Sequence, residues 1–123
     1  CQYCYSGGEL ATLSKKKRPL PAYPTPDDIA EMVEYAIVKE KCATSLQITG
    51  GSRFDDQAEL DTILSILKAI DQQVGLANIP GEIVVYITPP KDPTSLDQIF
   101  AAGAKRFIPD FETARDAVGS RFE

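Results

Sequence analysis

The chain has 123 residues, of which 43% are hydrophobic, and a formal net charge of -5. This length and apolar content are enough for one buried core, whereas the negative charge argues against a general DNA- or RNA-binding protein, which needs a basic surface. No apolar run approaches the roughly 20 residues that cross a bilayer, so we expect no membrane association and a cytoplasmic protein.

The first predicted helix covers residues 26–41. Thr25 provides a capping hydroxyl and Pro26 suits the first helical position, while Asp27 and Asp28 favour the positive end of the helix dipole. Apolar residues then recur at helical spacing. The prolines between positions 19 and 26 predict a stiff, extended link that leads into this helix.

Strands and helices then alternate along the chain. Short β-branched or apolar runs that end at glycine or proline predict strands, and apolar residues three and four positions apart predict helices. This gives a strand at 45–49, a helix at 57–74, a strand at 82–88, a helix at 92–103 and a strand at 106–109. Such alternation predicts an α/β fold with a parallel sheet and right-handed crossovers. Residues 111–123 give only a weak helical pattern, and we expect the sequence to be truncated there.

Several polar or small residues follow the predicted strands. Chemistry in parallel α/β folds takes place in the loops at the carboxyl ends of the strands. A further strand before Cys1 would place the first cysteines in such a loop as well. We therefore expect these loops to lie together around one opening at the carboxyl end of the sheet, which we call the mouth. The candidate site residues in them are Cys1, Cys4, Gly50, Gly51, Ser52, Thr88 and Glu112.

Two motifs in these loops resemble those of the radical S-adenosylmethionine (radical SAM) enzymes. The tetrapeptide Cys1-Gln2-Tyr3-Cys4 is similar to the last four positions of the CxxxCxxC signature, which has an aromatic residue before its last cysteine. The tetrapeptide Thr49-Gly50-Gly51-Ser52 resembles the family's GGE-like sequence, with Ser52 in place of the acid. The resemblance spans residues 1 to about 110. The signature's first cysteine would lie four positions before Cys1.

The resemblance implies a partial (β/α) barrel of parallel strands, related to the TIM barrel and incomplete in this chain. Residues 1–123 would form the N-terminal part of that barrel in a longer enzyme, and the fragment alone would be inactive. Residues 1–25 would contain the cluster-binding loop and the proline-rich link. The implied cofactors are a 4Fe-4S cluster and S-adenosylmethionine. The implied partners are a small-molecule or biosynthetic substrate and an electron donor such as ferredoxin or flavodoxin.

The resemblance also implies a reaction and a role for each candidate residue. Reductive cleavage of S-adenosylmethionine would give methionine and a 5'-deoxyadenosyl radical that abstracts hydrogen from the substrate. Cys1 and Cys4 would bind the cluster, and Tyr3 would lie near the adenine. The remaining residues would contact S-adenosylmethionine or substrate, the glycines by allowing close approach of the main chain: Gly50, Gly51, Ser52, Thr88 and Glu112.

Each motif also has a simpler interpretation. CxxC occurs in zinc-binding and redox modules, although this chain has no histidine and only Cys42 as a further thiol. A glycine pair is common in turns, and Glu112 could be a helix-start acid. Cys42 precedes a strand, at the end opposite the mouth, which favours a structural role. Two alternatives therefore stay open, a zinc or redox module and an α/β binding fragment without a cofactor.

Overall fold

The computed structural model describes residues 24–49 and 56–109. Helix α2 (Pro26–Val33) begins at a capping box. The Asp28 amide donates to the Thr25 hydroxyl at 3.2 Å, and the Thr25 amide donates to the Asp28 carboxylate at 2.8 Å. Two of the backbone N–H groups that a helix start leaves without intrahelical partners are thereby satisfied.

The predicted helix at 26–41 is not a single α-helix. After α2 the chain continues as a π-helix, η1 (Glu34–Lys39), in which the Glu40 amide donates to the Tyr35 carbonyl at 2.8 Å. Lys41 then adopts a positive φ of 52°, and the Cys42 amide donates to the Ala36 carbonyl at 2.9 Å. The left-handed residue reverses the chain direction and ends the helix, a function that glycine usually performs.

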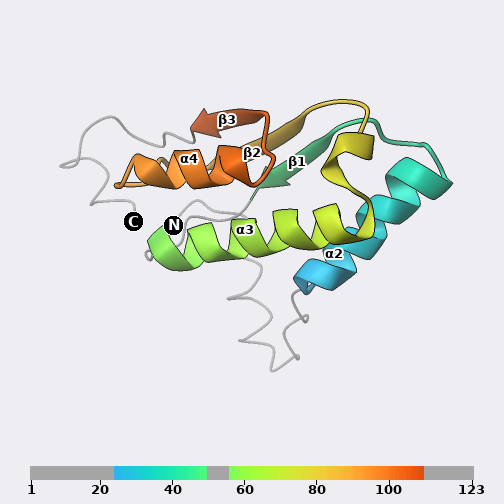
Figure 1. Cartoon of the computed structure of the whole chain (residues 1–123), viewed down its shortest axis with the longest axis horizontal. Helices are drawn as coiled ribbons and strands as arrows, with labels where there is room; N and C mark the ends of the chain where they lie inside the picture. The colour runs from blue at the N-terminus through green and yellow to red at the C-terminus, as the bar shows by residue number, and fades with distance from the viewer. Residues whose placement is uncertain (1–23, 50–55, 110–123) are drawn as a thin grey trace, which may run out of the picture. The chain divides into compact units, whose positions relative to one another are not determined.

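The described residues contain three parallel strands, which form a sheet in the order β1-β2-β3, as shown in Figure 1. They are β1 (Leu46–Thr49), β2 (Ile83–Ile87) and β3 (Arg106–Pro109). The connections carry α3 (Asp56–Gln73) and the 3-10 turn η2 (Leu76–Asn78), then α4 (Thr94–Ala101). The predicted order and the α/β class are confirmed, with boundaries shifted by a residue or two. The partial barrel remains a prediction.

The two faces of the sheet differ in composition. Alternate residues of β2, namely Ile83, Val85 and Ile87, are buried in one cluster with Leu67 of α3 and Ile99 of α4. This face is therefore covered by helices. The alternating side chains lie on the opposite face, which we call the helix-free face because no helix within 24–49 and 56–109 packs on it. Its residues are Gln47, Thr49, Val84, Tyr86, Arg106 and Ile108.

The start of β2 packs closely against the segment before β1. The Gly81 amide donates to the Thr44 carbonyl at 2.6 Å. A Cβ at position 81 would lie 2.6 Å from that same carbonyl oxygen and would collide with the Ser45 hydroxyl. Glycine therefore allows the two strands to begin side by side at the amino end of the sheet. Among the residues described, no helix is long and apolar enough to span a membrane.

Candidate functional site

The carboxyl ends of the strands define one edge of the sheet. Thr49, at the end of β1, pairs in register with Tyr86, which in turn pairs with Ile108 of β3. Because the three strands are parallel, all of them end at this edge. This is the edge at which parallel α/β folds place their functional loops.

The loop after β2 holds its shape through a local turn. Thr88 is exposed, whereas Pro89 and Pro90 are partly buried. The Thr94 amide donates to the Asp92 carboxylate at 2.9 Å. Hydrogen bonds from the Thr94 backbone and side chain lower the pKa of Asp92 below its ordinary value. An ionised aspartate therefore stabilises the turn that leads into α4.

A small cavity lies beside Thr88, on the helix side of the strand end. Its volume is about 10 Å³, and its lining residues are Glu59, Thr88 and Ser95 together with Leu60, Ile87, Pro90 and Ile99. Glu59 is 8% exposed and Ser95 is 9% exposed, and they are the two buried polar side chains of the described core. A buried carboxylate is costly unless it is paired or hydrogen-bonded, and Glu59 has such an interaction.

The helix-free face brings a second set of side chains to the same edge. The row Thr49, Tyr86 and Ile108 is the last before the loops begin. Toward the amino end, the guanidinium of Arg106, two residues before Ile108, contacts the Glu82 carboxylate at 2.7 Å. Tyr86 is partly buried and lies on this face. In a barrel this face would line the interior.

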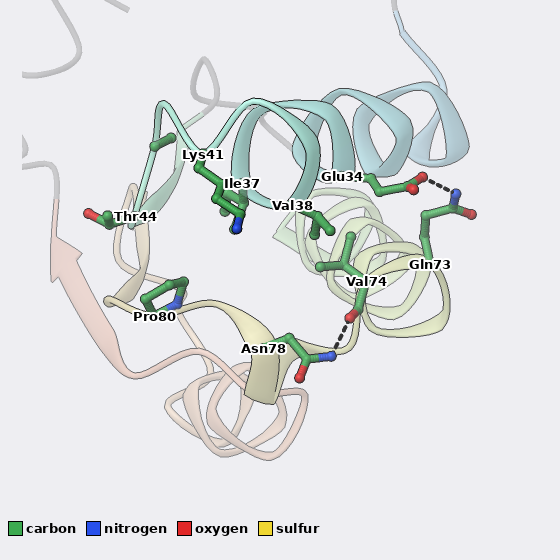
Figure 2. A pocket seen from close by; sticks show the side chains of 10 residues that line it. Glu34, Ile37, Val38, Lys41, Thr44, Gln73, Val74, Asn78 and Pro80 are labelled. Atoms are coloured by element: carbon green, nitrogen blue, oxygen red, sulfur yellow. Dashed lines mark hydrogen bonds between the residues drawn. The ribbon is translucent and has the colours of Figure 1, made fainter.

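A larger cavity lies at the opposite, amino end of the sheet, as Figure 2 shows. Its volume is about 420 Å³. Ile37, Val38 and Val74 contribute apolar surface, and Lys41 and Asn78 are polar lining residues. The Asn78 amide donates to the Val74 carbonyl at 2.7 Å. All of its lining residues precede the strands that they adjoin, so this cavity is remote from the carboxyl edge.

One side of this amino-end cavity carries an ionised glutamate. The Gln73 side chain donates to the Glu34 carboxylate at 2.7 Å, and the Lys39 ammonium lies 3.2 Å from it. The hydrogen bond from Gln73, and to a smaller extent that from Lys39, lowers the pKa of Glu34. The contact joins η1 to the end of α3. These interactions are exposed and join two helices, which indicates a structural role.

Of the candidate residues predicted from the sequence, Thr88 is the one that the structure describes. It lies at the carboxyl edge, directly after β2, as expected. The others lie outside the described residues: Cys1, Tyr3, Cys4, Gly50, Gly51, Ser52 and Glu112. Their positions in the site remain predictions.

Glu59 and Ser95 were not predicted from the sequence. Glu59 occupies the apolar stripe of α3, four residues before Ile63 and eight before Leu67, both of which are buried. An acid at that position of an amphipathic helix is a detectable signal, because charged residues are rarely buried without a partner. Ser95 has no comparable signal, since serine is common in the first turn of a helix.

Cys42 lies at the amino end of β1, the end expected for it. It is an exposed free thiol whose Sγ donates weakly to the Ala36 carbonyl at 3.5 Å. Within 24–49 and 56–109, no three histidine, cysteine or carboxylate side chains come together as a metal site. The predicted thiolate ligands, Cys1 and Cys4, lie outside the described residues.

Comparison with known proteins gives the family. A model of the radical SAM superfamily matches residues 1–122, a span that includes both motifs and the whole described α/β unit. The chain therefore belongs to the radical SAM superfamily. No curated protein and no solved structure matches the chain.

Proposed function

We propose that this protein is a radical SAM enzyme that cleaves S-adenosylmethionine reductively at a 4Fe-4S cluster. The observation that carries the proposal is the family match over residues 1–122. The parallel order of β1 and β2 supports it, since the loops after Thr49 and Ile87 begin at one edge. When bound, the cluster and S-adenosylmethionine supply a 5'-deoxyadenosyl radical, with methionine as coproduct, that abstracts hydrogen from the substrate.

In this proposal the protein's own residues bind and orient the cofactors. Cys1 and Cys4 provide thiolates, the donors that iron-sulfur clusters take. Tyr3 lies near the adenine. Gly50 and Gly51 allow the main chain to approach the methionine end of S-adenosylmethionine, Ser52 supplies a hydroxyl contact, and Thr88 contacts the ribose or the substrate. Glu112 contributes a further polar contact after β3.

The proposal also includes the completion of the barrel. In the described part of the chain, β1 and β3 each pair with β2 alone. Each is therefore an edge strand whose outer side is unpaired within that part. Exposed strand edges are normally paired or covered in proteins. The helix-free face carries Val84, Tyr86 and Ile108, which further strands would enclose as the barrel interior. Water would then be kept from the reaction by the protein around it.

The proposed partners follow from the reaction. A reductase protein such as ferredoxin or flavodoxin would deliver the electron, and a small-molecule or biosynthetic substrate would donate the hydrogen atom. These are proteins and metabolites of the cytoplasm, where we place the enzyme. The net charge of -5 agrees with a protein that does not bind DNA.

The experiment is anaerobic reconstitution of the full natural polypeptide that contains residues 1–123. Iron and sulfide uptake with a brown colour, followed by formation of 5'-deoxyadenosine and methionine after reduction with S-adenosylmethionine present, would support the proposal. Retention of zinc under air, without iron uptake, would favour a zinc module instead. Absence of both metals would favour an α/β binding unit without a cofactor.

A further inference from the structure

The cavity beside Thr88 combines three elements of the fold. Glu59 comes from the first turn of α3, Ser95 from the first turn of α4, and Thr88 from the end of β2. Both buried polar side chains of the described core line this one cavity. A polar cluster in an apolar core lowers stability unless its hydrogen bonds are satisfied, so a positional role is a reasonable explanation for it.

The size of the cavity limits what it can hold. About 10 Å³ of accessible volume is close to one water molecule, and a buried water needs roughly two to four polar partners. Glu59, Ser95 and Thr88 are the lining residues with polar side chains, and three polar residues are enough for one such water. The other lining residues, Leu60, Ile87, Pro90 and Ile99, are apolar and offer no side-chain alternative.

We propose that this cavity holds one ordered water that links Glu59 and Ser95 to Thr88, and that Glu59 and Ser95 are thereby positioning residues for Thr88 at the mouth. The water donates to the Glu59 carboxylate and accepts from a hydroxyl. Thr88 itself is exposed and can still contact a bound ligand. The positional part of this inference rests on the proposed function, because it assigns Thr88 to S-adenosylmethionine binding.

The first test is structural. A high-resolution crystal structure of the full natural polypeptide should show a water within hydrogen-bonding distance of the Glu59 carboxylate and of at least one of the two hydroxyls. A cavity closed by side chains, without water, would overturn the proposal. This measurement does not depend on the cluster or on activity.

The second test measures binding of S-adenosylmethionine to the reconstituted protein at equilibrium. Ser95→Ala and Glu59→Gln should each raise the dissociation constant by about three- to tenfold, the equivalent of one neutral hydrogen bond. The matched controls are Ser65→Ala, whose hydroxyl donates to the Thr62 carbonyl at 2.7 Å, and the exposed Glu31→Gln. Both controls should bind as the wild type does.

The outcomes separate the two proposals. If Ser95→Ala and Glu59→Gln lower the melting temperature but bind S-adenosylmethionine as tightly as the wild type, both residues are merely structural and the positional inference is wrong. The proposed function would then still stand. If the wild type itself binds no S-adenosylmethionine, the proposed function fails, and the positional role fails with it. The crystallographic water is judged separately.

Discussion

The cavities at the two ends of the sheet differ in both volume and chemistry. The amino end has a cavity of about 420 Å³, bordered by exposed groups such as Lys41 and Asn78. The carboxyl end has one of about 10 Å³, but it is lined by the buried side chains of Glu59 and Ser95. Larger size would favour the first cavity as a binding site, and buried polar chemistry favours the second.

The direction of the strands decides between the two ends. Parallel strands place their following loops at the carboxyl edge, whatever the surface looks like elsewhere. The amino-end cavity lies where two helices end and their connections turn back toward β1 and β2, so it is a product of the fold's connections. Strand direction and the buried polar groups therefore both favour the carboxyl end as the candidate site, although the amino-end cavity is larger.

The largest predicted effect contrasts two cysteines. Cys4→Ala should abolish cluster assembly, because a thiolate ligand is removed. Cys42→Ala should retain full iron content, because this thiol lies at the amino end of β1 and makes only a weak contact with the Ala36 carbonyl. Iron and sulfide analysis after reconstitution measures both. Equal loss of iron in the two variants would contradict the assignment of Cys4 as a cluster ligand and of Cys42 as a residue outside the site.

The second prediction concerns the amino end. Gly81→Ala should lower the free energy of unfolding by about 1–3 kcal/mol, since the new Cβ collides with the Thr44 carbonyl and the Ser45 hydroxyl. The folded fraction should bind S-adenosylmethionine normally. Denaturant unfolding and equilibrium binding measure the two quantities, with the exposed neighbour Pro80→Ala as control. A binding defect in folded Gly81→Ala protein would show that the amino end contributes to the site.

The third prediction compares two exposed threonines. Thr88→Val keeps the side chain's shape but removes its hydroxyl, and should weaken S-adenosylmethionine binding by about 0.5–1.5 kcal/mol, or roughly three- to tenfold. Thr44→Val makes the same change at the amino end and should have no effect on binding. Calorimetric titration of both variants provides the measurement. Unchanged affinity in Thr88→Val would remove this residue from the proposed site.

The smallest predicted effect is on the pH dependence of stability. Hydrogen bonds from the Thr25 hydroxyl and then the Thr25 amide lower the pKa of Asp28 below its model-compound value of 3.8. The lowered pKa means that Asp28 contributes stability above that value and loses it as the pH falls through the folded-state pKa. In Asp28→Asn the acid-induced loss of stability should therefore be slightly smaller than in the wild type.

Unfolding in denaturant at neutral pH and at about pH 3 would measure this difference. Asp27→Asn is the matched control, because the neighbouring carboxylate lies in the same helical turn but outside the capping box. A larger acid-induced loss in Asp28→Asn than in the wild type would contradict the sign of the shift.

Much of the fold could be predicted from local sequence. The β-branched run of β2 and the apolar spacing of α3 predict their elements within a residue or two, and the capping hydroxyl of Thr25 predicts where α2 begins. The π-helical continuation of α2 was not predictable. It is followed by Lys41 in a left-handed conformation, which glycine usually adopts, so no local sequence pattern marks this helix end.

The site was only partly predictable from the sequence. Thr88 could be placed because it directly follows a strand, and strand direction alone fixes its edge. Glu59 could have been noticed as an acid in an apolar stripe. Its proximity to Ser95, 36 positions away, depends on how α3 and α4 pack on the sheet, which no local pattern determines. Long-range packing thus accounts for the part of the site that sequence reasoning missed.

The central claim is that this polypeptide carries out reductive cleavage of S-adenosylmethionine. The most direct measurement is chromatographic detection of 5'-deoxyadenosine after the reconstituted, reduced natural polypeptide is incubated with S-adenosylmethionine, with the Cys4→Ala variant beside it. We predict 5'-deoxyadenosine and methionine from the wild type and neither from the variant. A wild-type protein that assembles its cluster yet forms no 5'-deoxyadenosine, with or without reductant, would contradict the account.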